Sequence, residues 1–225
     1  MAKHGKRYQK QAAQAARKPL NIQEAIEAVK SFDTADFDQS VECVLNLGID
    51  PKHADQIVRG SISLPNGIGK QKKVVVFCEA EEEESAKQAG AFQAGSDGLL
   101  KKIEDGWMDF DVAIASPKVM RKVGKLGRVL GPKGKMPSPK NGTVTENITQ
   151  AVKEFKAGKV EFRNDAGGNI HAVVGKQSFE TDKLLENVNA FISHIKKLRP
   201  QSSKGAYIKK MYLSATMSPS VSVNV

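Results

Sequence analysis

Two short apolar runs in the middle of the chain constrain its fold more than any other feature. Residues 73–78 read KVVVFC and residues 111–115 read DVAIA. Neither run alternates with polar residues, which is typical of strands that are buried on both faces of a parallel sheet. Helical patterns at 81–91 and 98–104 separate the two runs, and this alternation of strands and helices predicts a parallel α/β sheet.

Both ends of the chain show a different pattern, in which apolar and polar residues alternate as they do in half-buried strands. Such strands are expected at 41–47, 160–163, 170–174 and 207–216. A turn with the sequence NDAGG joins the second and third of them. Amphipathic helices are expected to begin at Asn21 and at Thr181, and Pro51 is placed to start a short helix that ends near Gly60.

The change of pattern predicts two domains in this chain of 225 residues. Residues 1–67 and 160–225 are expected to form a discontinuous α+β domain, a split β-α-β sandwich. Residues 68–159 are expected to form an inserted Rossmann-like domain with three α/β/α layers. Glycine-containing segments at 65–69 and 156–159 lie at the two crossings between these domains.

The positive charge of the chain is concentrated in three windows. The formal net charge is +10, and residues 1–23, 112–145 and 187–225 hold 20 of the 35 lysines and arginines without a single acid. An evenly mixed surface is the ordinary expectation, so this segregation predicts basic faces that attract polyanions. A nucleic acid is the favoured partner, and a membrane surface or an acidic protein is the alternative.

The segment 123–144 is the most irregular part of the sequence. It contains five glycines, three prolines and five lysines or arginines, and it has no acid. Glycine and proline at this density predict a fixed loop rather than a helix or a strand. A shaped loop with a uniformly positive field suits a polyanion better than a small neutral substrate.

Several common kinds of chemistry are missing from the sequence. The Gly-Lys pairs at 69–70, 134–135 and 158–159 lack the residues that a phosphate-binding P-loop requires around them. The four histidines do not pair with a cysteine or an acid at ligand spacing. The sequence therefore predicts no enzyme, no cofactor and no metal site, and an α/β nucleotide-using enzyme is kept only as a third hypothesis.

Cysteine usage and hydropathy favour a cytoplasmic protein. Cys43 and Cys78 stand far apart and are expected to be small buried hydrophobic residues in a reducing compartment. No apolar run approaches the ~20 residues that a membrane helix needs, so no membrane partner is expected. An organelle is the alternative location, because the basic N-terminus faintly resembles a transit peptide.

Four long segments carry a resemblance to a known family. They are LNLGIDPKHADQIVRGSISLP at 45–65, VLGPKGKMPSPKNGTV at 129–144, KAGKVEFRND at 156–165 and KGAYIKKMYLSATM at 204–217. In these segments the chain resembles the bacterial ribosomal protein L1 family, whose members belong to the mobile stalk of the large ribosomal subunit. The likeness covers essentially the whole chain and implies the two-domain fold described above.

The resemblance also implies the partners. The family binds a structured segment of large-subunit ribosomal RNA as a monomer within the ribosome, contacts transfer RNA at the exit site and aids its release. Many members bind a similar RNA shape in the messenger RNA of their own operon and repress its translation. The leading hypothesis is therefore a structural protein of the large ribosomal subunit, and a translational repressor is the second.

Nine positions match residues that contact RNA in the family, on the domain made from the two termini. They are Glu27, Phe37, Ser40, Arg163, Asp165, His171, Ser214, Thr216 and Met217. This mixture suits RNA, which proteins recognise through 2′-hydroxyls, phosphates and stacking. The alternatives are a core position for Phe37, loop packing for Met217 and an ordinary strand-surface position for His171.

Secondary basic contacts are predicted at Lys133, Lys135, Lys140, Lys204 and Lys209. The first three lie in the glycine-rich segment, which the resemblance assigns to the inserted domain. There they either contact ribosomal or transfer RNA, or belong to a loop whose role is purely structural.

Several positions depart from the family's pattern, and three of them bear most on RNA binding. Asp36 stands where the family often has a lysine, which removes one phosphate partner and adds repulsion. Ser218 and Ser220 stand where the family has glycines near the C-terminus. If either glycine is needed for a positive φ or a close approach of RNA, this loop differs here, and Lys204 and Lys209 are candidates to compensate.

Overall fold

The computed structural model of the protein describes residues 5–15, 18–32 and 35–224, and in it the chain forms two compact units. The first unit joins the chain up to Gly69 to the chain from Val160 onwards, and the second unit runs from Lys70 to Lys159. The first crossing lies two residues later than its expected position after residue 67, because the side chain of Ile68 is buried in the core of the first unit.

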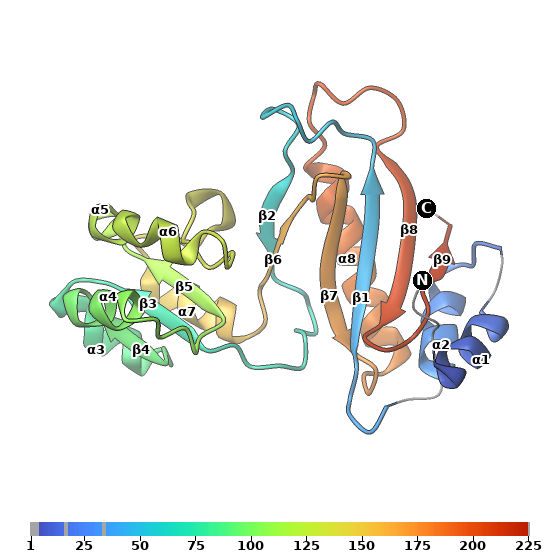
Figure 1. Ribbon diagram of the computed structural model, residues 1–225, viewed down its shortest axis with the longest axis horizontal. Coiled ribbons are helices and arrows are strands. Elements are labelled where there is room, and N and C mark those ends of the chain that lie inside the picture. Colours follow the sequence, from blue (N-terminus) through green and yellow to red (C-terminus); the bar gives the residue numbers. More distant parts are fainter. Residues whose placement is uncertain (1–4, 16–17, 33–34, 225) are drawn as a thin grey trace. The chain divides into compact units, whose positions relative to one another are not determined.

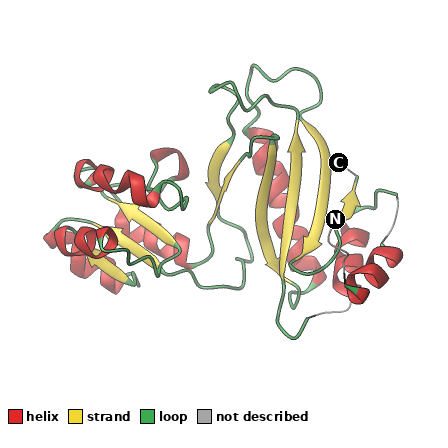
Figure 2. Ribbon diagram, in the orientation of Figure 1, coloured by secondary structure: helices red, strands yellow, loops and turns green. Residues whose placement is uncertain are grey.

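The first unit contains a four-stranded antiparallel sheet in the order β7-β1-β8-β9 and a separate two-stranded sheet of β2 and β6 (Figures 1 and 2). Its strands are β1 (Ser40–Leu47), β2 (Arg59–Ile62), β6 (Val160–Arg163), β7 (Asn169–Lys176), β8 (Ile208–Ala215) and β9 (Val221–Val223). Its helices are α1 (Lys6–Gln14), α2 (Ile22–Ser31) and α8 (Thr181–Lys197). Strand β1 lies between β7 and β8, so the two ends of the chain complete one sheet.

One face of this sheet is covered by helices and the other is open. Val41, Cys43 and Leu45 of β1 are buried in a core that also takes the apolar stripes of α2 and α8. The residues between them in β1 are half-buried, as the alternating sequence predicts. Burial raises the pKa of the Cys43 thiol to about 12, which keeps it protonated and unreactive.

The second unit is built on a three-stranded parallel sheet in the order β4-β3-β5. Its strands are β3 (Val74–Phe77), β4 (Gln93–Gly95) and β5 (Val112–Ala115). Its α-helices are α3 (Ala80–Gln88), α4 (Asp97–Glu104), α5 (Met120–Val123), α6 (Gly127–Leu130) and α7 (Ile148–Lys156), and its 3-10 helices are η1 (Gly124–Leu126) and η2 (Pro139–Asn141).

All the residues of β3 and β5 are buried, as the two apolar runs predict. Val75 and Phe77 face a core that contains residues of α4, α5 and α6, whereas Val74 and Val76 face a second core that contains residues of α3 and α7. Helices therefore cover both faces of this parallel sheet. Among the described residues, no helix is long and apolar enough to cross a membrane.

The glycine-rich segment is less irregular than its composition predicts. Residues 124–130 continue α5 as η1 and α6, and only the remainder of the segment is mostly turn and loop. Val123, Leu126 and Leu130 recur at helical spacing and are fully buried in one core of the second unit. Burying each such side chain contributes about 1.5–3 kcal/mol, which exceeds the cost of about 1 kcal/mol for each glycine in a helix.

The helix expected after Pro51 is also absent. Residues 51–56 form successive turns, in which the Asp50 carboxylate accepts a hydrogen bond from the Lys52 N–H (3.0 Å) and the Gln56 side-chain oxygen accepts one from the Asp50 N–H (2.8 Å). An aspartate that bonds to the backbone two residues later favours a turn over a helix. The chain then passes directly into β2.

The strands at 160–163 and 170–174 exist but do not pair as a hairpin. Strand β6 pairs with β2, and β7 pairs with β1. A single bridge between Asn164 and Ile170 links the two strands at the turn that joins them. Strands β4 and β9, of three residues each, give no clear alternation in the sequence and were not predicted.

Candidate nucleic-acid interface

All nine predicted RNA-contacting residues lie in the first unit, and the structure divides them into two groups and one separate residue. The edge cluster consists of Phe37, Ser40, Ser214, Thr216 and Met217, and it lies where β1 begins and β8 ends. The turn cluster consists of Arg163, Asp165 and His171, around the turn between β6 and β7. Glu27 is the remaining residue, on the exposed surface of α2, where its carboxylate accepts a hydrogen bond from the Gln23 side chain (3.3 Å).

Ser40 and Thr216 tie the two ends of the chain together in the edge cluster. The Thr216 hydroxyl oxygen accepts a hydrogen bond from the Ser40 N–H (3.2 Å), and the Thr216 N–H donates to the Ser40 carbonyl (3.1 Å). The Lys176 ammonium group donates to the Ser40 hydroxyl (3.1 Å). The Thr216 hydroxyl also donates to the Ser40 carbonyl (3.4 Å), so its oxygen keeps acceptor capacity that a ribose 2′-hydroxyl can use. The Ser40 hydroxyl, which accepts from Lys176, keeps its own O–H as a donor for a ribose or phosphate oxygen.

A buried glutamine supports the same cluster, and the sequence gives no sign of it. Gln39 is 1% exposed, and its side-chain oxygen accepts a hydrogen bond from the Met217 N–H (2.8 Å). Its carbonyl accepts a second one from the Gln177 N–H (2.9 Å). Gln39 therefore holds the loop after β8 against the start of β1.

Two large apolar side chains of the edge cluster point into solvent. Phe37 is 51% exposed and Met217 is 48% exposed, so the alternative of a core position for Phe37 is wrong. Exposed aromatic and thioether groups are available for stacking and for apolar contacts with a partner.

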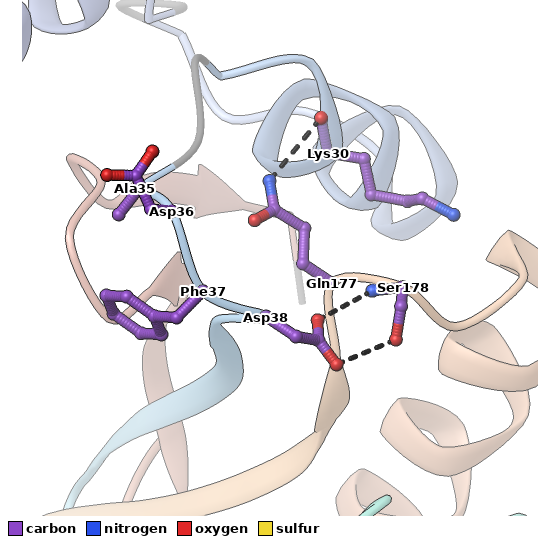
Figure 3. A pocket seen from close by; sticks show the side chains of 7 residues that line it. All are labelled: Lys30, Ala35, Asp36, Phe37, Asp38, Gln177 and Ser178. Atoms are coloured by element: carbon purple, nitrogen blue, oxygen red, sulfur yellow. Dashed lines mark hydrogen bonds between the residues drawn. The ribbon is translucent and has the colours of Figure 1, made fainter.

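Phe37 borders a hollow that two aspartates share (Figure 3). Asp38 is exposed but fixed in place, because its carboxylate accepts hydrogen bonds from the Ser178 N–H (3.1 Å) and the Ser178 hydroxyl (2.8 Å). Asp36 is exposed and makes no ion pair with the described residues. Beside Phe37 there is therefore a negative charge that no described cation pairs with.

A second hollow brings the N-terminal helix to the edge cluster. It is lined by Gly5, Arg7, Tyr8, Thr216, Met217 and Ser218. Sequence reasoning singled out the basic N-terminal arm as a whole and missed these positions in it. The signal that was available is the acid-free window 1–23, but such a window does not say which of its cations lies at a given site.

The two serines that replace the family's glycines do not need a glycine's conformational freedom. Among the described residues no residue other than glycine has a positive φ, so the backbone at Ser218 and Ser220 is open to any residue. The Ser218 hydroxyl oxygen accepts a hydrogen bond from the Ala215 N–H (2.9 Å) and its O–H faces the Pro219 carbonyl (3.1 Å). The serine thus closes the turn with its own side chain.

The turn cluster is organised by one carboxylate. Asp165 accepts hydrogen bonds from the backbone N–H groups of Gly167 and Asn169 (both 2.8 Å) and from the Asn169 side-chain amide (3.0 Å). The amide of Asn169 is the largest cause that lowers the pKa of Asp165, to about 2. His171 lies on the same side, with its Nε2 atom 3.7 Å from a carboxylate oxygen of Asp165.

The five predicted secondary lysines differ in availability. Lys135 is held inside the second unit, because its ammonium group donates to the carbonyls of Met108 (3.1 Å) and Phe110 and lies 4.9 Å from the centre of the Phe110 ring. Lys133 and Lys140 of the same unit are exposed. Lys204 and Lys209 are exposed on the first unit.

The described residues contain no group of three or more His, Cys, Asp or Glu side chains arranged to hold a metal ion. The chemistry of the edge and turn clusters is that of hydroxyls, one guanidinium, one imidazole, one carboxylate and exposed apolar groups.

The sequence matches one protein family over most of its length. Residues 29–219 match the model of the Ribosomal protein L1p/L10e family. A protein of Lactobacillus gasseri named large ribosomal subunit protein uL1 is 51% identical over 222 residues, which cover 98% of this chain and 96% of the relative. A protein of Maridesulfovibrio salexigens with the same name is 46% identical over 224 residues, which cover 100% of this chain and 96% of the relative.

A match of this extent leaves the shared ancestry in no doubt: the chain belongs to the ribosomal protein L1p/L10e family.

Proposed function

We propose that this protein is a structural component of the large subunit of the cytoplasmic ribosome and binds large-subunit ribosomal RNA at the mobile stalk. The family consists of ribosomal proteins and not of enzymes, and its curated members here are named as large-subunit proteins. The observation that carries the proposal is the edge cluster, in which residues from both ends of the chain are joined by the hydrogen bonds between Ser40 and Thr216.

The RNA-binding surface is assigned to the first unit. Hydroxyls and carboxylates bond to 2′-hydroxyls, the Arg163 guanidinium pairs with phosphate, and the exposed ring of Phe37 packs on a ribose or base. The second unit, with its parallel sheet between two layers of helices, is assigned a Rossmann-like fold. Its exposed Lys133 and Lys140 serve as secondary contacts to ribosomal RNA or to exit-site transfer RNA, whose release the protein assists.

Binding to a stalk RNA fragment tests this proposal. The native protein should bind this RNA more tightly than an unrelated hairpin, and each neutralised phosphate should add about 0.7–0.9 to the slope of log K against log salt. Filter binding over a salt series measures both quantities. Equal affinity for the two RNAs would reject the proposal.

A single hydroxyl tests the assignment of the edge cluster. Thr216→Ala removes a hydrogen-bonding group and should weaken binding to the stalk RNA by about 0.5–1.5 kcal/mol. Ser193→Ala, an exposed serine on α8 outside both clusters, is the control and should bind like the native protein. An unchanged affinity for Thr216→Ala would remove Thr216 from the site.

Repression of translation from the messenger RNA of its own operon is the second candidate function. The same edge and turn clusters would serve it, because a messenger that reproduces the shape of the stalk RNA presents the same groups. Comparing affinities for the two RNAs separates the functions: a messenger that binds no better than an unrelated hairpin excludes repression and leaves the ribosomal function intact.

A further inference from the structure

Two arginines face each other across the small sheet of the first unit. In the antiparallel pairing of β2 with β6, Arg59 lies directly opposite Arg163. The two strands lie side by side in Figure 1. Directly opposed residues of an antiparallel pair point to the same face, so the two side chains share one side of this sheet.

The register brings these side chains as close as a sheet allows. The Asn164 N–H donates to the Val58 carbonyl (3.0 Å), and the Asn164 side-chain oxygen accepts from the Val58 N–H (2.9 Å). Positions 58 and 164 therefore form a hydrogen-bonded pair. Hydrogen-bonded and non-bonded pairs alternate along an antiparallel ladder, so Arg59 and Arg163 form a non-bonded pair, in which side chains approach most closely.

Neither arginine of this pair forms an ion pair within the described part of the chain. Glu161 lies two residues along β6, opposite Ser61. The Nε–H of Arg59 is buried and has no hydrogen-bond partner among the described residues. Like charges directly opposite each other destabilise a sheet, and a buried donor without a partner adds to that cost.

We propose that Arg59 and Arg163 together form a clamp for one backbone phosphate of the bound RNA. A phosphate bound between the two guanidinium groups would attract each of them and so offset their mutual repulsion. Its oxygens can accept hydrogen bonds from several N–H donors at once. The inference rests on the proposed RNA binding and deepens it, because Arg59 matches none of the nine predicted contacts. Asp165 and His171 follow Arg163 along the chain, so the clamp is continuous with the turn cluster.

The substitution Arg59→Gln tests the clamp, with affinity for the stalk RNA fragment and thermal unfolding of the free protein as the two readouts. Affinity should fall roughly tenfold or more, as expected for a lost hydrogen bond to a charged group. The salt slope should fall by about 0.7–0.9, which corresponds to one phosphate. The unfolding midpoint should stay the same or rise, because the opposed charge is gone.

Two further variants complete the experiment. Lys153→Gln removes one positive charge from an exposed position on α7, outside the three basic windows, and should bind the RNA like the native protein. Arg59→Lys keeps the charge but loses the two-pronged guanidinium, so affinity should fall while the salt slope is retained.

The possible failures are distinguishable. If the native protein does not prefer the stalk RNA, the proposed function itself fails. If the native protein binds and Arg59→Gln binds like Lys153→Gln, the clamp is wrong and RNA binding stands. A loss of affinity that is accompanied by a lower unfolding midpoint would assign Arg59 a structural role and would also overturn the clamp.

Discussion

A single carboxylate, that of Asp165, organises the turn that leads into β7. Its pKa lies at about 2 instead of the ordinary 3.8, chiefly because the Asn169 amide bonds to the ionised form. A carboxyl group with a lowered pKa in the folded state stabilises the fold above pH 4 and loses that contribution as the pH falls through about 2. The Asp165 carboxylate therefore stays negatively charged at every physiological pH.

The substitution Asn169→Ala should raise the pKa of Asp165 from about 2 toward 3.8, because the largest favourable interaction of the carboxylate is removed. A carboxyl-carbon NMR titration between pH 1.5 and 6 (on the order of ten points) measures the shift. Gln150→Ala, on an exposed position of α7, is the control and should leave the pKa of Asp165 unchanged. A pKa that stays at about 2 in Asn169→Ala would assign the effect to the backbone N–H groups instead.

Asp36 is a position at which a substitution should strengthen RNA binding and not weaken it. Its exposed carboxylate lies beside Phe37 without an ion-pair partner among the described residues, so Asp36→Lys should increase the affinity for the stalk RNA. If the new lysine reaches a phosphate, the salt slope should increase by about 0.7–0.9. Asp105→Lys makes the same charge change on the exposed surface of the second unit and should have a smaller effect. If both variants gain the same affinity, the effect of Asp36→Lys comes from the change in net charge and not from its position beside Phe37.

At the level of whole elements, the glycine-rich segment contains two kinds of lysine. Lys135 donates to the carbonyls of Met108 and Phe110, which would otherwise lack these bonds, whereas Lys133 extends into solvent. Lys135→Ala should destabilise the second unit by about 1–3 kcal/mol, and Lys133→Ala should change its stability by less than about 0.5 kcal/mol.

Urea unfolding followed by tryptophan fluorescence measures this difference, because the only tryptophan, Trp107, lies 5.5 Å from the Phe110 ring between their centres. The RNA affinity should behave in the opposite way if the second unit provides secondary contacts, with a loss for Lys133→Ala. Similar stabilities of the two variants would mean that the bonds made by Lys135 are weak in solution.

Elements with one strong periodic pattern of apolar residues could be predicted from the sequence. Elements whose formation depends on the balance between side-chain burial and the helix cost of glycine could not. The buried strands β3 and β5 and the alternating strand β1 are confirmed, because burial on two faces or on one face leaves a direct mark on the sequence. The helical part of the glycine-rich segment was missed because three buried side chains outweigh the glycines around them. Local sequence does not show that burial, which depends on a core made by distant residues.

The candidate site also combines features that could be predicted from the sequence with features that could not. Resemblance supplied the nine positions, but it did not indicate that Gln39 is buried beneath them or that Arg59 faces Arg163. Both facts depend on strand register, which joins residues more than a hundred positions apart. A register is fixed by pairing across the fold, and no local pattern in the sequence records it.

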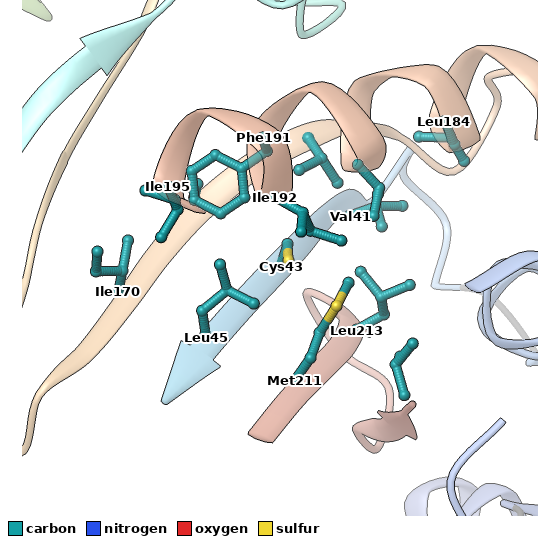
Figure 4. Packing of buried hydrophobic residues seen from close by; sticks show 14 of the residues in the cluster. Val41, Cys43, Leu45, Ile170, Leu184, Phe191, Ile192, Ile195, Met211 and Leu213 are labelled. Carbon is teal, nitrogen blue, oxygen red and sulfur yellow. The ribbon is translucent and has the colours of Figure 1, made fainter. Parts of the chain in front are cut away.

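For the molecule as a whole, the two units have separate cores. Phe191 of α8 is fully buried in the core of the first unit (Figure 4). Its ring meets that of Phe162 edge to face, at 5.9 Å between ring centres. The cores around β3 and β5 contain residues of the second unit only. A substitution that leaves a cavity in one core should therefore destabilise only the unit that contains that core.

Phe191→Ala should destabilise the first unit by about 3–5 kcal/mol and leave the unfolding of the second unit nearly unchanged. Trp107 reports on the second unit alone, so its fluorescence transition in urea should stay in place while the far-UV circular dichroism transition moves to lower urea. Val152→Ala, at a buried position of the second unit, is the reciprocal control and should shift the fluorescence transition. Coincident shifts of both signals would show that the units unfold together.

Strand β1 has its two neighbours, β7 and β8, on the far side of the inserted unit in the sequence. Because translation proceeds from the N-terminus, β1 emerges early and waits for partners that are made last, while the inserted unit already has all three of its strands. A nascent chain that stops before β8 lacks Ser214, Thr216 and Met217 and has only Phe37 and Ser40 of the edge cluster. Under the proposed function, an unfinished copy should bind the stalk RNA more weakly than the completed protein, so the order of synthesis favours the completed protein for that RNA.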